Sequence, residues 1–139
     1  MPDVIIKEIN HESTWKLRNE VLYPDGKLNE MGMEEDIEGT HFGVFEKDVI
    51  VAIISLFFEG NSCQFRKFAV DPSMQGKGVG RLLLAHITEY AASKSATILW
   101  CNARISAIGF YIKGGFKHTG KFFTKNSFEY EILEKNLQP

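Results

Sequence analysis

The chain has 139 residues, of which 44% are hydrophobic, 12% aromatic and 24% charged, so composition and length predict one globular domain over residues 1–139. No apolar run is long enough to span a membrane and the first residues lack a secretory signal, which predicts a cytoplasmic protein that binds no membrane. Cys63 and Cys101 are too far apart for a C-x-x-C pair, so we expect no metal site and no disulfide framework. The acidic pI of about 6.1 argues against a nucleic-acid binder.

The net charge of −2 is unevenly distributed along the chain. Residues 1–75 hold 14 acidic and 7 basic side chains, a balance of −7, whereas residues 76–139 hold 4 acidic and 9 basic ones, a balance of +5. This division suggests one half that faces an anion and another that faces a cation. An uneven distribution over a solvated surface would give the same numbers, so both interpretations stay open.

In the first half of the chain, hydrophobic spacing predicts a strand over residues 4–9 and a helix over residues 11–22 that ends before Pro24. Residues 25–33 read as a loop, and residues 33–38 as a short acidic helical segment closed by Gly39. A β-hairpin is expected over residues 41–46 and 49–58, with its turn at Lys47 and Asp48.

In the middle of the chain, residues 63–70 alternate in polarity and are rich in aromatic and β-branched types, which predicts a strand. Pro72 ends this strand because proline removes a backbone donor. A long helix follows, with apolar residues at helical spacing on one face: Val79, Leu82, Leu83, His86, Ile87, Tyr90 and Ala91.

Further elements complete the sheet. We expect a buried strand over residues 95–101, a second helix over residues 105–113 closed by Gly114 and Gly115, and a final hairpin over residues 116–123 and 127–133. Alternating helices and hairpins of this kind indicate an α/β (α+β) protein with a mixed, mostly antiparallel central sheet flanked by helices.

Three glycines, Gly76, Gly78 and Gly80, stand between the middle strand and the long helix. Glycine lets the backbone turn sharply and approach a ligand, and the first turn of a helix presents N–H groups to an anion. Lys77 and Arg81 add positive charge at the same point. The stretch therefore predicts a phosphate-binding turn, although it matches neither the P-loop nor the dinucleotide pattern. The alternative is a glycine-rich turn without a ligand.

Two segments carry a resemblance to a known family. Gln75-x-x-Gly78-x-Gly80 resembles the acyl-CoA pyrophosphate turn of the GCN5-related N-acetyltransferases (GNAT), which also lies between a central strand and its helix. The Phe110-Tyr111 pair that precedes Gly115-Phe116 resembles a later segment of the same family. The expected order of strands and helices extends the likeness over the whole chain, and it implies the acyl-CoA N-acyltransferase fold.

This resemblance implies an N-acetyltransferase that moves the acetyl group of acetyl-CoA to a primary amine of a small molecule or peptide. Backbone groups of Phe68, Ala69 and Val70 would bind the pantetheine arm and polarise the thioester carbonyl. The pyrophosphate would lie on the turn formed by Gln75, Gly76, Lys77, Gly78, Val79 and Gly80. A non-catalytic acyl-CoA-binding module remains the alternative function.

The resemblance also assigns roles in the second half. Tyr111 matches the tyrosine that protonates the departing thiolate as a general acid, although its neighbours also fit a core aromatic. Asn102 either hydrogen-bonds the cofactor arm or caps the next helix.

Other parts of the reaction stay open. The general base is not identified among Glu59, His41, His118 and Glu129. An acidic group of five residues either attracts a cationic acceptor or belongs to a solvated loop: Glu30, Glu34, Glu35, Asp36 and Glu38. A homodimer and a monomer are equally compatible with the sequence.

Overall fold

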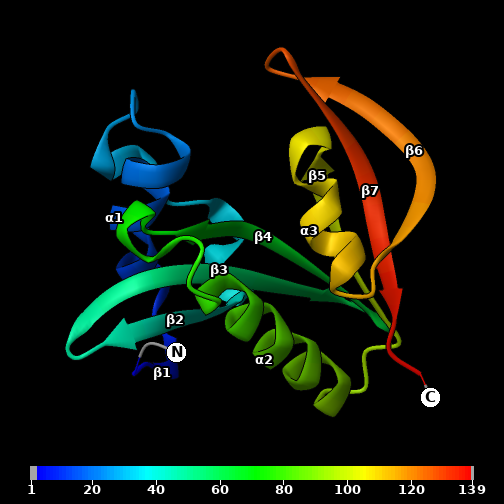
Figure 1. The fold of residues 1–139 in the computed structure, drawn as a ribbon, viewed down its shortest axis with the longest axis horizontal. Helices are drawn as coiled ribbons and strands as arrows, with labels where there is room; N and C mark the ends of the chain where they lie inside the picture. The colour runs from blue at the N-terminus through cyan, green and yellow to red at the C-terminus, as the bar shows by residue number, and fades with distance from the viewer. Residues whose placement is uncertain (1–2, 139) are drawn as a thin grey trace. The chain divides into compact units, whose positions relative to one another are not determined.

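Strands, α-helices and short 3-10 and π-helical turns follow one another along the chain in the computed structural model, which describes residues 3–138 (Figure 1). The chain divides into a first unit, Met1–Phe57 with Phe65–His86, and a second unit, Phe58–Gln64 with Ile87–Pro139. Hydrogen bonds connect seven strands in the order β1-β2-β3-β4-β5-β7-β6. The pairs β1–β2, β2–β3, β5–β7 and β6–β7 are antiparallel, and β4–β5 is parallel. The predicted mixed, mostly antiparallel sheet is confirmed.

The first unit is built on strands β1 (Ile5–Ile9), β2 (Thr40–Glu46), most of β3 (Val49–Glu59) and the end of β4 (Ser62–Val70). The predicted hairpin between β2 and β3 is present, and Lys47 in its turn has a φ of 58°. A run of six buried residues, 51–56, makes β3 the apolar centre of this unit.

The predicted helix over residues 11–22 has the expected bounds but consists of three short types of turn. A 3-10 helix (His11–Thr14) leads into a single α-turn, α1 (Trp15–Leu17), and then a π-helix (Arg18–Leu22). The Asn10 side chain caps the start by accepting the Ser13 N–H at 2.9 Å. The π-helix begins at Arg18, whose side chain is completely buried and whose partners lie elsewhere in the unit.

The second unit contains β5 (Ile98–Arg104), α3 (Ile108–Lys113), β6 (Lys117–Lys125) and β7 (Phe128–Asn136). β7 lies between β5 and β6 in the order of hydrogen-bonded strands. Asn126 and Ser127 connect β6 to β7 with φ values of 51° and 69°, which is the conformation of a two-residue hairpin turn. The strand predicted over residues 95–101 is displaced toward the C-terminus, since β5 runs from Ile98 to Arg104. It begins later because Ser95 still belongs to the turn after the preceding helix, with a φ of 68°.

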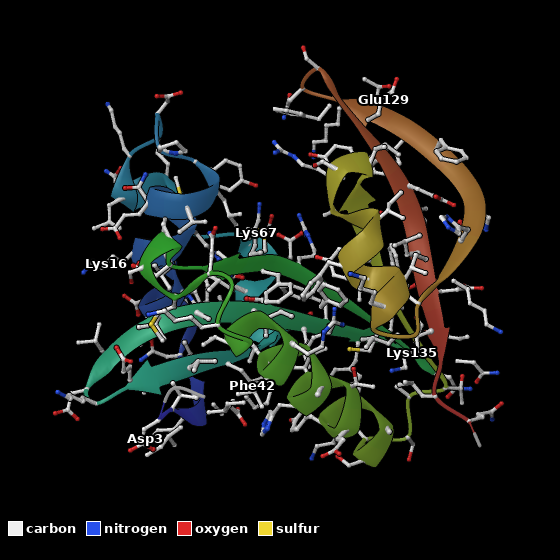
Figure 2. All side chains as sticks on the ribbon, in the orientation of Figure 1. Asp3, Lys16, Phe42, Lys67, Glu129 and Lys135 are labelled. Carbon is white, nitrogen blue, oxygen red and sulfur yellow. The ribbon has the colours of Figure 1, made fainter. Side chains whose placement is uncertain are left out.

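Helix α2 (Val79–Ser93) has the apolar face that the sequence predicts. Five of its side chains are buried: Val79, Leu83, Leu84, Ile87 and Ala91. In the first unit, Phe42 of β2 packs edge-on against His86, with ring centroids 5.2 Å apart (Figure 2). No helix within the described part of the chain is long and apolar enough to cross a membrane.

Candidate active site

The turn after β4 is held by a short set of hydrogen bonds in the first unit. Asp71 accepts the Ser73 N–H at 2.9 Å and the Ser73 hydroxyl at 2.7 Å, and its own N–H donates to the Val51 carbonyl at 2.8 Å. The side chain of Gln75 donates from Nε2 to the Val70 carbonyl at 2.9 Å. Met74 is buried beneath the turn. These contacts fix the end of the strand against the start of the glycine segment.

The glycine segment itself needs glycine for conformational reasons. Gly76 and Gly78 have φ values of 78° and 84°, which side-chain-bearing residues rarely adopt. Residues 75–78 are exposed, whereas Val79 is fully buried and anchors the start of α2. The first N–H groups of an α-helix have no partner inside that helix. The segment therefore presents backbone donors and Lys77 to solvent, a geometry that fits an anionic group.

Strand β4 is irregular just before this turn. Lys67 has a φ of 56°, a left-handed conformation that is uncommon for a lysine and locally interrupts the pleat. The parallel ladder with β5 contains three residue pairs, from Ser62↔Ile98 to Gln64↔Trp100. Phe68, Ala69 and Val70 therefore lie in β4 beyond that ladder, and their role in binding the thioester stays a prediction.

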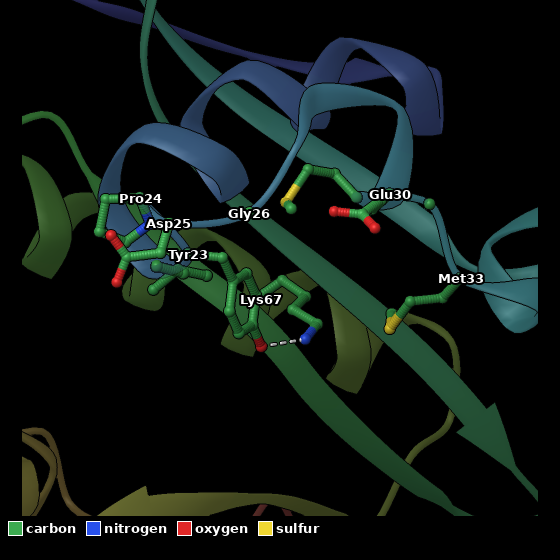
Figure 3. A pocket seen from close by; sticks show the side chains of 10 residues that line it. Tyr23, Pro24, Asp25, Gly26, Glu30, Met33 and Lys67 are labelled. Atoms are coloured by element: carbon green, nitrogen blue, oxygen red, sulfur yellow. Dashed lines mark hydrogen bonds between the residues drawn. The ribbon is translucent and has the colours of Figure 1, made fainter. Parts of the chain in front are cut away.

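The first unit also contains a cavity of about 440 Å³. Its wall is formed by residues of the segment from Leu22 to Met33 and by Lys67 of β4 (Figure 3). The ammonium group of Lys67 donates a hydrogen bond to the Tyr23 hydroxyl and lies 4.5 Å from the centroid of the Tyr23 ring. The sequence predicts a loop over most of this segment, and no sequence pattern singles out Tyr23, Asp25 or Lys67. The only local signal was a Tyr-Pro-Asp-Gly turn, which predicts a bend and no cavity.

One member of the acidic group has a structural role that the sequence did not indicate. Asp36 is 1% exposed and receives two hydrogen bonds from the buried guanidinium of Arg18, at 2.7 and 3.0 Å. The Met33 N–H adds a third at 2.8 Å. Burial alone would raise the pKa of Asp36, but these hydrogen bonds and the charge of Arg18 outweigh it and hold the pKa below its ordinary value. Asp36 is therefore not a surface charge that can attract a cationic acceptor.

The remaining members of the group are exposed at the surface. Glu35 pairs with Arg66 of β4 at 3.3 Å, and Glu30 accepts the Lys27 N–H at 2.9 Å. Only Glu30 lines the cavity.

His41 is not available as a general base. It is buried in β2, where Nδ1 lies 2.7 Å from the Ser55 hydroxyl and Nε2 lies 2.9 Å from the Asp36 carbonyl. Because a carbonyl can only accept, Nε2 carries the proton and Nδ1 accepts from Ser55. Burial also lowers the pKa of His41, so the ring stays neutral.

The other candidate bases belong to the second unit. Glu59 and Glu129 are exposed at the ends of their strands. His118 is bonded through Nδ1 to Glu131 at 2.8 Å, and Glu131 also accepts the Gly120 N–H at 3.0 Å where β6 bulges. This arrangement gives His118 a structural partner.

Tyr111 lies on α3 in an aromatic group of the second unit. Its ring centroid is 5.3 Å from that of Phe110 and 5.8 Å from that of Phe116. Burial raises the pKa of the Tyr111 phenol, and the nearby Cys101 thiol acts in the same direction. Burial also raises the pKa of Cys101 itself, to about 12. Both groups thus carry their protons at neutral pH.

The predicted position of Asn102 is wrong in one respect. It lies within β5, opposite Ile132 of β7, and therefore does not cap the next helix. Its side chain is exposed, so a hydrogen bond to a ligand remains its predicted role. Across residues 3–138, no group of three or more His, Cys, Asp or Glu side chains is arranged to hold a metal ion.

Similar proteins were found by sequence and by structure. A family model described as the acetyltransferase (GNAT) domain matches residues 38–118, more than half of the chain. The uncharacterized N-acetyltransferase YitI of Bacillus subtilis (strain 168) is 29% identical over 127 residues, which cover 85% of this chain and 85% of YitI.

Solved structures show the same fold at low sequence identity. The ribosomal-protein-S18-alanine N-acetyltransferase of Escherichia coli superimposes with a TM-score of 0.81 at 16% identity, covering 99% of this chain and 96% of that chain. An aminoglycoside 6'-N-acetyltransferase complexed with coenzyme A gives a TM-score of 0.79 at 15% identity, covering 97% and 98% of the two chains. With the family match, these likenesses identify the fold and the class of enzyme: the chain belongs to the acetyltransferase (GNAT) family of N-acyltransferases.

Proposed function

We propose that this enzyme transfers the acetyl group of acetyl-CoA to the primary amine of a small molecule or peptide. The observation that carries the proposal is the geometry of residues 75–80. Two exposed glycines with positive φ precede a helix start, and Lys77 lies between them. The side chain of Gln75 holds the Val70 carbonyl through its hydrogen bond. The pyrophosphate would therefore bind the backbone of residues 75–80 and not the Gln75 side chain. The structural neighbour that is complexed with coenzyme A supports the cofactor class.

In the reaction, the amine nitrogen would bond to the thioester carbonyl carbon as the carbon–sulfur bond breaks, and the proton that the amine loses would pass to water. When bound, acetyl-CoA supplies the acetyl group and the thiolate leaving group. Backbone groups of Phe68, Ala69 and Val70 would orient the thioester and stabilise the oxyanion. Tyr111 would donate its phenolic proton to the departing sulfur and would then regain a proton from water. Burial raises the pKa of this phenol, so it holds its proton at neutral pH but is a weaker acid than an exposed tyrosine.

The experiment compares Gly78→Asp with the matched control Gly60→Asp. Both glycines are exposed and have positive φ, at 84° and 57°, so the backbone strain is similar, but Gly60 lies in the β3–β4 turn. A carboxylate about 4 Å from a phosphate is repelled by about 4 kcal/mol at an effective dielectric of 20. We therefore expect calorimetry to show at least about a tenfold loss of acetyl-CoA affinity for Gly78→Asp. Equal affinities in the two folded variants would place the cofactor elsewhere.

Thiol release with a panel of amines tests the catalytic step separately. Release that depends on an added amine supports the acetyltransferase. Tight acetyl-CoA binding without release for any amine would instead favour the non-catalytic acyl-CoA-binding module.

A further inference from the structure

The cavity of the first unit is lined by groups of opposite charge that do not neutralise one another. Lys67 carries a positive charge, and Asp25 and Glu30 carry negative charges. Within residues 3–138, neither carboxylate forms an ion pair with Lys67. In Figure 3 the Asp25 carboxylate points away from Lys67, whereas Glu30 lies across the opening from it. A ligand that carries both charges would satisfy both sides of the cavity.

Both charged groups are held in place before any ligand arrives. Glu30 accepts the Lys27 N–H at 2.9 Å through Oε1, which leaves its second oxygen for another donor. Lys67 is held by the Tyr23 hydroxyl and by the face of the Tyr23 ring. An ammonium group has three donors, so Lys67 can bind an anion while it keeps this contact.

The backbone at Lys67 is strained in a way that a glycine would avoid. A left-handed conformation is unfavourable for a residue with a side chain. The chain nevertheless carries lysine at this position, with a φ of 56°, and the side chain lines the cavity. Strain of this kind often accompanies a functional position. A local use for the ammonium group would explain it.

The rest of the cavity is suited to an apolar body of modest size. Leu22, Met31 and Met33 contribute aliphatic and thioether surface, and methionine adapts its shape to different ligands. The volume of about 440 Å³ is at the small end of the range for ligand pockets, roughly 300–1,000 Å³.

We propose that the acceptor is a small apolar amine that also carries an anionic group, as in an amino acid with an aliphatic side chain. Its anionic group binds Lys67, its ammonium group approaches through Glu30, and its side chain contacts Met31 and Met33. This inference rests on the proposed acetyl transfer and names the substrate class of that site. A carboxylate and a phosphate share the chemistry that Lys67 recognises, so the test includes both.

The test uses matched amines at saturating acetyl-CoA. Leucine, leucinamide and isoamylamine share a side chain, and of these three only leucine carries an anionic group. Phosphoethanolamine carries a phosphate but no aliphatic side chain, so it tests the anionic group alone. We expect kcat/KM for leucine or for phosphoethanolamine to exceed that for leucinamide and isoamylamine by at least about tenfold, since a charge-assisted hydrogen bond is worth about 1.5–3 kcal/mol. Equal or faster acetylation of leucinamide and isoamylamine would overturn the proposal.

Lys67→Met keeps an unbranched side chain and removes the charge. The matched control is Lys16→Met, at an exposed lysine of α1 that does not line the cavity (Figure 2). We expect Lys67→Met to lower the ratio of kcat/KM for the anionic amine to that for its uncharged analogue by at least about tenfold, and Lys16→Met to leave the ratio unchanged. An equal loss for all amines in Lys67→Met would show a structural role and would overturn the proposal.

A binding measurement separates this proposal from the proposed function. Calorimetry with leucine, leucinamide and phosphoethanolamine, each added to protein saturated with CoA, does not require acetyl transfer. If no amine releases thiol but an anionic amine binds more tightly than leucinamide through Lys67, acetyl transfer fails and the assignment of the cavity holds. If amines are acetylated without any dependence on an anionic group, acetyl transfer holds and the assignment of the cavity fails.

Discussion

The buried pair of Arg18 and Asp36 allows a prediction with a magnitude. Both side chains are fully buried, and the guanidinium also donates to the Met31 carbonyl at 2.9 Å and the Ser55 hydroxyl at 3.0 Å. Asp36→Asn keeps the shape and removes the negative charge, which leaves an uncompensated guanidinium in the core. Breaking a buried pair in this way typically costs about 3–5 kcal/mol, out of a usual stability of about 5–15 kcal/mol. For a chain of this length, the melting temperature should fall by about 10–17 °C.

The assay is urea unfolding followed by circular dichroism, with Glu35→Gln as the control. Glu35 is the neighbouring acid but is 54% exposed in its pair with Arg66, so its removal should change the midpoint little. The double variant Arg18→Met/Asp36→Asn removes both charges and should be more stable than the sum of the single losses predicts. An Asp36→Asn midpoint equal to that of the wild type, at an unchanged m-value, would refute this account of the pair.

The same pair predicts a direction for acid unfolding. The pKa of Asp36 is lower in the folded state than its ordinary value of 3.8. The stabilisation is therefore complete above the unfolded pKa, and it is lost as the pH falls through the lower folded value. The stability gap between the wild type and Asp36→Asn should narrow below about pH 4.

Three further predictions concern the second unit. Tyr111→Phe should lower kcat about tenfold to a hundredfold at saturating acetyl-CoA and leave acetyl-CoA affinity unchanged; full kcat would mean that Tyr111 only packs. Because the pKa of Tyr111 is raised above its ordinary value of about 10, the phenol keeps its proton from pH 7 to 10. We therefore expect no decline of the wild-type kcat over this range that is absent in Tyr111→Phe. Glu131→Gln should speed hydrogen exchange at the β6 bulge around Gly120, and exchange rates equal to those of the wild type would show that the carboxylate does not hold the bulge.

Local chemistry explains what the sequence could predict. Gly76 and Gly78 occupy positions whose φ values only glycine adopts readily. Their spacing was therefore enough to predict the turn and the start of the helix that follows it. The apolar face of α2 and the hairpin turn at Lys47 are likewise set by nearby residues. The order of these elements, together with the turn, was enough for the family and the fold.

Long-range contacts explain what the sequence could not predict. Arg18 and Asp36 are 18 residues apart, and nothing local distinguishes Asp36 from the exposed acids beside it. His41 likewise reads as a free imidazole until its contacts with Ser55 and the Asp36 carbonyl are known. The cavity depends on the contact between Lys67 and Tyr23, 44 residues earlier in the chain, and no sequence pattern indicates the left-handed backbone at Lys67. Such features arise from packing and have no period in the sequence.

The position of β7 has a consequence for how the second unit assembles during synthesis. β7 is made after β5 and β6 but is hydrogen-bonded to both of them, while β5 and β6 do not pair with each other in the order of strands. A nascent chain released only as far as Lys125 therefore holds two strands that lack the partner between them, and exposed strand edges favour aggregation. The second unit can form its complete ladder only after Phe128–Asn136 has left the ribosome, so ribosome stalling in the β6–β7 turn should leave this half of the protein sensitive to protease.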